Sequence, residues 1–386
     1  MSGRHIAVAI PAMDERESLP LLLDDLVAQQ WPSLTVYVCV NQPDAWWHDG
    51  DEKHVSVCRN NALLLQQLPQ WAHQLDLVVL DCSSPSMGWQ QKRQGVGWAR
   101  KRLLDHIMAA TSHDDIIVSL DAVTRIAENY LRRLADSFAM HPSWAAVAVP
   151  YYHRLSGDET IDRPLLRYEC YMRHYLIQLL RIANPYAFTA IGSAMAFTAR
   201  AYSRSGGISP LQGGEDFYLM QKFVRTGTVG LTLEGDADDI PVFPSGRVSH
   251  RVPFGTGPAV SLSLADQAAR YPFFAPEGFA AVEETFSRFA DLYGQDVDTP
   301  MTCFLQHQLD TDDLWGPLRR NHTSIERFVH ACIERVDGLR ILQYLRSRPD
   351  GILPDSAVAD FEQAPLEQID ALRNDLLRKE MLLRQQ

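Results

Sequence analysis

The segment IIVSLDAVT, residues 116–124, decides the fold of this 386-residue chain. Its apolar run predicts a strand that is buried on both faces, as strands of parallel sheets are. Asp121 stands where this strand is expected to end. Open α/β sheets bind ligands just outside the carboxyl ends of their strands. An acid at this position is therefore a candidate ligand-binding residue.

More short apolar runs lie on both sides of this strand in the sequence, and helical patterns separate them. Such alternation of strand and helix predicts a doubly wound, mostly parallel α/β sheet with right-handed crossovers. The predicted strands are 5–10, 34–40, 75–80, 116–120 and 145–149. The predicted helices are 18–30, 59–68, 96–110, 127–140, 165–182, a short one that ends at Gly206-Gly207, and 215–226.

The chain changes character at about Pro258, where strand-like runs disappear and helix formers dominate. Helices are predicted over 279–293, 324–346 and 365–383. The last one repeats apolar residues at helical spacing, which predicts a packed amphipathic helix. A homodimer contact through these C-terminal helices is the alternative. We expect one domain over 1–257 and a helical extension over 258–386.

The composition excludes some classes of protein. A net charge of −12 argues against a broad nucleic-acid-binding surface. The six cysteines are scattered and form no C-x-x-C motif, which favours reduced, buried thiols. The chain starts without the apolar region of a signal peptide, and no apolar run is long enough for a transmembrane segment. We therefore expect a cytoplasmic protein, with peripheral membrane contact left open.

Four blocks, in order along the chain, carry a resemblance to a known family. They are 7–20 (AVAIPAMDERESLP), 95–102 (GVGWARKR), 120–124 (LDAVT), and a last group made of 192–197 (GSAMAF), Gly206-Gly207 and 214–216 (GED). Together they resemble the family 2 glycosyltransferases, whose motifs include Pro-Ala-Tyr-Asn-Glu and Leu-Asp-Ala-Asp-Thr. The resemblance covers roughly the first two-thirds of the chain and leaves out the helical tail.

This resemblance implies the type-A glycosyltransferase fold, with a nucleotide-binding half over 1–124 and an acceptor half over 125–257. It also implies that Pro11, Ala12 and Glu15 line the nucleotide pocket.

Two further donor-binding positions follow from the same resemblance. Asn41, at the end of the second strand, stands where the family usually has an aspartate that contacts the base or ribose. An asparagine can still donate and accept hydrogen bonds there. Arg100 matches the family arginine near the base, and an exposed helix residue is the alternative interpretation.

Asp121 matches the first acid of the Asp-x-Asp element, which in the family holds the ribose and a divalent cation. The cation is Mn²⁺ or Mg²⁺, and such hard cations prefer oxygen ligands. Val123 stands at the second acid of the element and cannot bind a metal. The element is thus degenerate, and we expect weak or unusual metal dependence. His250 is a candidate metal ligand, with a structural role as the alternative.

Glu215 and Asp216 open a predicted helix and are the candidate catalytic pair. In the family the aspartate takes the proton of the acceptor hydroxyl, and a general base must be ionised. A helix start favours a carboxylate, so we expect Asp216 to be ionised at neutral pH, with helix capping as the alternative role. Arg247 and Arg251 lie in a glycine-rich basic segment and could hold a diphosphate, replacing the missing metal charge.

The resemblance therefore implies a glycosyltransferase of the hexosyltransferase type, as in bacterial carbohydrate biosynthesis. It would move a sugar from a nucleotide-diphosphate sugar to an unknown acceptor hydroxyl with inversion, with Asp216 as the base. One alternative is a non-catalytic nucleotide-sugar-binding module with a degenerate metal site, which Val123 and Asn41 favour. The other is a sugar-phosphate nucleotidyltransferase, although such enzymes usually have a glycine-rich loop after the first strand and residues 11–15 contain no glycine.

Overall fold

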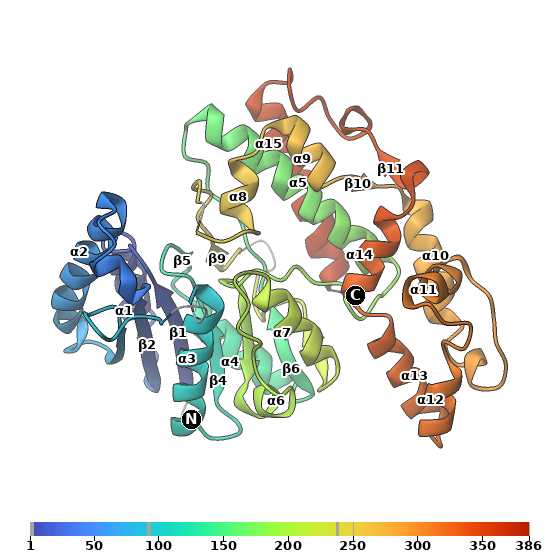
Figure 1. Ribbon diagram of the computed structural model, residues 1–386, viewed down its shortest axis with the longest axis horizontal. Coiled ribbons are helices and arrows are strands. Elements are labelled where there is room, and N and C mark those ends of the chain that lie inside the picture. Colours follow the sequence, from blue (N-terminus) through green and yellow to red (C-terminus); the bar gives the residue numbers. More distant parts are fainter. Residues whose placement is uncertain (1–3, 91–93, 237–238, 250, 386) are drawn as a thin grey trace. The chain divides into compact units, whose positions relative to one another are not determined.

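The structure is a computed structural model that describes residues 4–90, 94–236, 239–249 and 251–385 (Figure 1). The chain divides into two compact units. The first runs up to Asp162 and resumes over Ala190–Ser261, and the second comprises Arg163–Thr189 and the chain from Leu262 onward. The division differs from a single boundary at 257–258 mainly because residues 163–189 belong to the second, helical unit.

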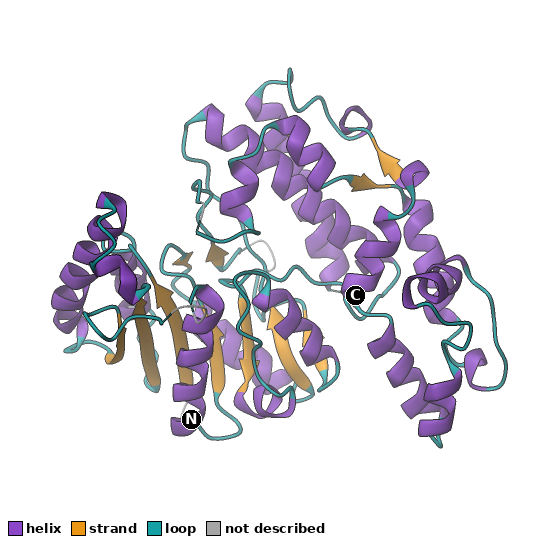
Figure 2. Ribbon diagram, viewed as in Figure 1, coloured by secondary structure: helices purple, strands orange, loops and turns teal. Residues whose placement is uncertain are grey.

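A seven-stranded sheet with the order β3-β2-β1-β4-β7-β6-β8 forms the centre of the first unit (Figure 2). All pairings are parallel except those of β7, which runs antiparallel to both β4 and β6. The predicted class, a doubly wound and mostly parallel α/β sheet followed by a helical extension, is confirmed. The strands are β1 (Ile6–Ala12), β2 (Leu34–Asn41), β3 (Asp76–Cys82), β4 (Ile116–Ser119), β6 (Trp144–Ala148), β7 (Met195–Thr198) and β8 (Thr228–Gly230).

Strand β7 was not predicted from the sequence, and it matters for the site. It is four residues long and reads MAFT, without the Ile and Val that mark the equally short β4, so it gives only a weak strand signal. Met195 pairs with Ser119 at the end of β4. The Ser119 hydroxyl also donates to the carbonyl of Gly192 at 2.7 Å. This strand therefore brings the turn around Gly192 beside the end of β4.

The helices of the first unit agree with the sequence pattern except at some ends. Helix α3 (Val96–Ala110) packs on β1 and β2 and matches its predicted range. Helix α2 (Glu52–Gln67) begins earlier than predicted because the Asp51 carboxylate accepts from the amide of Lys53 at 2.8 Å and caps it. The other elements are α1 (Leu19–Ala28), α4 (Tyr130–Met140), α6 (Ala199–Arg204), α7 (Glu215–Val224), α8 (Thr256–Val260) and the antiparallel pair β5 (Arg125–Ile126) and β9 (Val242–Phe243).

The second unit is helical, with one short two-stranded ribbon. The prediction of a single helix over 324–346 is wrong, because the chain breaks after α13 (Ile325–Arg335). The Asp337 carboxylate accepts from the amide of Arg340 at 3.0 Å and starts α14 (Gly338–Arg346). The expected absence of strands is also wrong, since β10 (Phe273–Phe274) pairs with β11 (Ile352–Leu353). The remaining helices are α5 (Glu159–Arg181), whose first residues belong to the first unit, α9 (Leu264–Arg270), α10 (Pro276–Ser287), α11 (Pro300–Leu309), α12 (Gly316–Asn321) and α15 (Leu366–Arg384).

Among the described residues, no helix combines the length and the apolar character needed to cross a membrane.

Candidate active site

A buried arginine joins the predicted donor-binding acid to the predicted catalytic pair. Arg100, in the first turns of α3, is only 4% exposed, so the alternative of an exposed helix residue is wrong. Its Nη2 donates to Oδ1 of Asp121 at 2.5 Å, and its Nη1 donates to Oε1 of Glu215. We call Arg100, Asp121 and Glu215 the acidic cluster. It brings together side chains from α3, the end of β4 and the start of α7.

Two glycines create the space that this cluster needs. A Cβ on Gly192 would lie 2.0 Å from Nη2 of Arg100, so no side chain fits where the guanidinium lies. A Cβ on Gly97 would lie 2.1 Å from the carbonyl oxygen of Leu211, which allows the loop before α7 to approach the start of α3. Both glycines therefore permit close contacts that any other residue would prevent.

Asp216 is the second residue of α7, beside the acidic cluster. The N-cap of this helix is Gly214, with φ 76°, so Asp216 does not occupy the capping position. Its Oδ1 accepts from the amide of Phe217 at 2.8 Å. Burial and the neighbouring Glu215 carboxylate raise the pKa of Asp216 to about 7, although Arg100 opposes the shift. A pKa near 7 does not agree with the expectation that Asp216 is ionised at neutral pH, because burial and Glu215 outweigh the effect of the helix start.

A second group of charges lies at the exit of β1. Glu15 is 6% exposed, and its Oε1 accepts from Nη2 of Arg247 and forms an ion pair with Nη1 of Arg251 at 2.7 Å. Nη1 of Arg251 also donates to the carbonyl of Met13. We call Glu15, Arg247 and Arg251 the arginine clasp. It ties the basic segment of the sequence to the predicted nucleotide pocket.

Both groups lie at the same edge of the sheet. Strands β1 and β4 are parallel neighbours in which Ala9 pairs with Ser119. In this register Pro11 and Ala12, the last residues of β1, reach the same edge as Asp121. This is the carboxyl edge, where open α/β sheets bind ligands.

Asn41 ends β2 at this edge, but its amide is largely used within the protein. Nδ2 donates to the carbonyl of Ala12 at 2.9 Å and to that of Cys39 at 3.3 Å. Oδ1 accepts from the indole of Trp89 at 3.1 Å. Both N–H groups of the Asn41 amide already donate to backbone carbonyls. A ligand could therefore only donate a hydrogen bond to Oδ1, which can accept one more. Asn41 thus holds β1, β2 and Trp89 together, and this role of Trp89 was not found from the sequence.

The described residues do not form a conventional divalent-cation site. Oδ1 of Asp121 already accepts from Arg100, and Val123 offers no ligand. Within the part of the chain that the structure describes, no group of three or more His, Cys, Asp or Glu side chains could hold a metal ion. The remaining candidate ligand, His250, lies outside the described residues.

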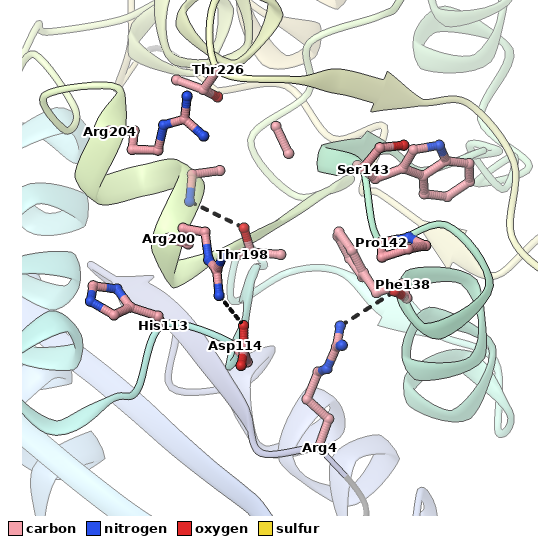
Figure 3. A pocket seen from close by; sticks show the side chains of 13 residues that line it. Arg4, His113, Asp114, Phe138, Pro142, Ser143, Thr198, Arg200, Arg204 and Thr226 are labelled. Atoms are coloured by element: carbon pink, nitrogen blue, oxygen red, sulfur yellow. Dashed lines mark hydrogen bonds and ion pairs between the residues drawn. The ribbon is translucent and has the colours of Figure 1, made fainter.

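A separate hollow of about 330 Å³ opens at the opposite edge of the same sheet (Figure 3). It lies where β4 and β6 begin, and Arg4, His113, Arg200 and Arg204 contribute to its lining. Arg200 donates to Asp114 at 2.7 Å. None of the residues predicted from the sequence as a site lines it. The hollow is thus distinct from the candidate active site.

No protein-family model matches this chain, and no curated protein matches it. Solved structures do resemble it, at low sequence identity. One is S. aureus TarS 1–349 in complex with UDP, at 13% identity and a TM-score of 0.43, covering 99% of this chain and 90% of that one.

Two more carry the names of sugar-transferring enzymes. The mannosyltransferase PcManGT from Pyrobaculum calidifontis, in complex with GDP-Man and Mn²⁺, is 14% identical with a TM-score of 0.40, covering 98% of this chain and 86% of that one. Glucosyl-3-phosphoglycerate synthase from Mycobacterium tuberculosis, in complex with UDP, is 15% identical with a TM-score of 0.35, covering 73% and 79%. Because all three TM-scores are low, the likeness alone assigns no function.

Proposed function

We propose that the protein is a glycosyltransferase of the family 2 type, which moves a hexose from a nucleotide-diphosphate sugar to an acceptor hydroxyl. The observation that carries this proposal is the acidic cluster, in which Arg100 joins Asp121 to Glu215 beside Asp216. Asp121 is expected from the family motif to meet the donor, and Asp216 to meet the acceptor. The buried guanidinium of Arg100 links the predicted donor-binding acid to the start of the helix that carries Asp216. This link supports a single reaction centre that contains both acids.

The proposed reaction is a single displacement at the anomeric carbon. The acceptor oxygen forms its bond to this carbon while the bond from the carbon to the diphosphate oxygen breaks. Asp216 takes the acceptor proton, and the electron pair of the broken bond leaves with the diphosphate. Attack opposite to the leaving group inverts the anomeric centre. A base with a pKa of about 7 matches this task, because near neutral pH part of it is ionised and that ionised form is basic enough to take the proton.

The charge that stabilises the leaving diphosphate is proposed to come from arginine. The clasp residues Arg247 and Arg251 are about a third exposed, with 38% and 32% of their side-chain surface accessible. Guanidinium groups match the geometry of phosphate oxygens and hold them with charge-assisted hydrogen bonds. Since the described carboxylates form no cage for a cation, we expect a chelator such as EDTA to leave turnover within about twofold of its untreated value. A strict requirement for added Mn²⁺ or Mg²⁺, measured after chelation and re-addition, would contradict this.

A non-catalytic nucleotide-sugar-binding module is the second candidate function. Val123 favours it, because the second acid of the metal-binding motif is missing. Asp216 favours catalysis, because a binding module has no use for a half-buried carboxyl group with a pKa of about 7. A nucleotidyltransferase fits less well, since residues 11–15 have no glycine.

The test of the proposal is a screen of nucleotide sugars in two steps. A donor that binds the native state raises the melting temperature by mass action. Each donor that does so is then incubated with the protein and a mixture of acceptor sugars, and the released nucleoside diphosphate is measured. Binding with release supports the transferase, binding without release supports the module, and the absence of any binding contradicts both.

A further inference from the structure

The arginine clasp has an asymmetry that the proposed function does not use. Oε1 of Glu15 accepts from Nη2 of Arg247 and forms an ion pair with Nη1 of Arg251, so one carboxylate oxygen contacts both guanidinium groups. The Glu15 side chain is 7% exposed, whereas those of Arg247 and Arg251 are 38% and 32% exposed. A ligand that approaches the clasp would therefore meet the arginines and not the glutamate.

The turn that carries Glu15 is held in place from a neighbouring helix. Asp14 has φ 60°, in the left-handed region that a residue with a side chain seldom adopts. Its amide donates to Oδ1 of Asn61 at 2.9 Å, and its Oδ1 accepts from Nδ2 of Asn60 at 2.5 Å. Both asparagines belong to α2. A strained residue that is held this firmly is typical of functional sites, where the surroundings determine its conformation.

The clasp is left with charge and donors to spare. Two guanidinium groups and one carboxylate carry a net charge of +1. Each guanidinium has five N–H donors, and among the described residues one nitrogen of each arginine contacts the clasp carboxylate. Oε2 of Glu15 is buried and has no hydrogen-bond partner there. The net positive charge and the spare N–H donors of the arginines thus fit an anion with several oxygens, such as a diphosphate, while the buried Oε2 takes no part in binding it.

We propose that Glu15 is a positioning residue that holds Arg247 and Arg251 as a preformed pair for the diphosphate of the donor. This inference rests on the proposed function and deepens it. Arginine side chains have many rotamers, and ordering them when a ligand binds weakens the binding. A buried carboxylate that orders both in advance removes this cost. The alternative, in which Glu15 competes with the diphosphate for the arginines, predicts the opposite effect of removing its charge.

The experiment compares Glu15→Gln with Glu17→Gln in the full chain. Glu17 is exposed on the same turn, so its substitution removes an equal charge without touching the clasp. The probes are UDP, GDP, ADP and CDP with their matching monophosphates, and titration calorimetry measures each affinity. For the base that binds, Glu15→Gln should lower the ratio of diphosphate to monophosphate affinity about tenfold, because two side chains must be ordered on binding. Glu17→Gln should keep the wild-type ratio.

Other results overturn the inference. A higher diphosphate affinity in Glu15→Gln shows that the glutamate competes, and an unchanged ratio shows that it does not position the arginines. If Glu15→Gln does not fold, the double variant Arg247→Gln/Arg251→Gln takes its place, since both side chains are partly exposed. If the double variant keeps the wild-type ratio of diphosphate to monophosphate affinity, the arginines do not bind the diphosphate and the inference is wrong. If the wild-type protein binds no nucleoside diphosphate, the proposed function itself fails. If the wild type binds one and only the Glu15→Gln result disagrees, the positioning role of Glu15 fails alone.

Discussion

Each compact unit of this chain contains a buried group of arginines and carboxylates, and the two groups differ in access. In the acidic cluster of the first unit, Arg100 and Glu215 are 5% and 2% exposed at their side chains, but Asp121 is 37% exposed. In the second unit, Arg173 joins Glu169 to Glu380, and all three side chains are at most 1% exposed.

The closed group of the second unit has the features of a structural element. Arg173, on α5, donates to Glu169 at 2.5 Å and to Glu380 of α15 at 2.6 Å, so it ties one helix to another. Burying such charges is costly, and removing one partner leaves a buried charge uncompensated. The comparison teaches that buried ion pairs do not by themselves indicate a site. A site is indicated where one carboxylate stays accessible and a neighbouring acid has a pKa near neutrality, as Asp121 and Asp216 do.

The largest expected effect comes from removing the central arginine of each group. Arg100→Met leaves the carboxylates of Asp121 and Glu215 without their cation. We expect the free energy of unfolding to fall by about 3–5 kcal/mol. Turnover per folded molecule should fall by about 100- to 1,000-fold, because a charged group of the reaction centre is lost.

Arg173→Met is the matched variant in the second unit. We expect a similar loss of stability, about 3–5 kcal/mol, with turnover per folded molecule within about twofold of wild type. Urea unfolding followed by fluorescence, with activity normalised to the folded fraction, measures both quantities. If Arg100→Met and Arg173→Met lost turnover equally, the acidic cluster could not be distinguished from the structural ion pairs around Arg173.

A smaller effect is expected from Gly192→Ala, which pushes on the acidic cluster without removing a charge. The new Cβ would lie 2.0 Å from Nη2 of Arg100, so the guanidinium must move. We expect a loss of about 1–3 kcal/mol in the free energy of unfolding, as for other overpacked sites, and a loss of turnover of at least about tenfold. Gly294→Ala is the control, since the nearest atom to its Cβ would be 3.9 Å away. Wild-type turnover in Gly192→Ala would show that the position of Arg100 does not matter.

The smallest expected effect concerns the stability of Asp216→Asn at different pH values. The pKa of Asp216 is about 7 in the folded protein, above the usual value of 3.8 that applies in the unfolded chain. Between these values the folded state binds more protons, so this carboxyl group lowers the free energy of unfolding as pH rises. We expect Asp216→Asn to gain on the order of 1–2 kcal/mol relative to wild type between about pH 5 and about pH 8 in urea titrations. A difference between the two proteins that does not change with pH would contradict the raised pKa.

The sequence predicted most of the sheet because its strands carry short apolar runs, which in β1, β2, β4 and β6 are almost fully buried. β1, β2, β3, β4 and β6 were all found, whereas β7 and β8 were missed: β8 has three residues, and β7 reads MAFT, without the Ile and Val that mark the equally short β4. The break before α14 was missed because a single capping aspartate, Asp337, outweighs a continuous apolar pattern. A capping hydrogen bond of this kind cannot be read from the spacing of apolar residues, so the apolar pattern alone did not reveal the break.

The candidate site was predicted less completely, for a physical reason. Arg100 and Glu215 are 115 residues apart in sequence, and no spacing rule joins them. The ionisation of Asp216 was predicted from its helix start, but burial and the Glu215 carboxylate outweigh that effect. The contacts of Glu15 with the arginines likewise depend on where Arg247 and Arg251 lie relative to β1. Tertiary contacts decide these properties, so only a structure reveals them.

The most direct test of the proposed reaction is the kinetics of Asp216→Asn with the nucleotide sugar that the screen identifies. The variant keeps the shape and loses the group that takes the proton. We predict that kcat falls by about 100- to 10,000-fold while donor affinity stays near wild type. We also predict that kcat of the wild-type protein falls as pH drops below about 7, because the base becomes protonated. An Asp216→Asn variant that keeps wild-type kcat, or a wild-type kcat that does not change between about pH 5 and about pH 8, would show that Asp216 is not the base.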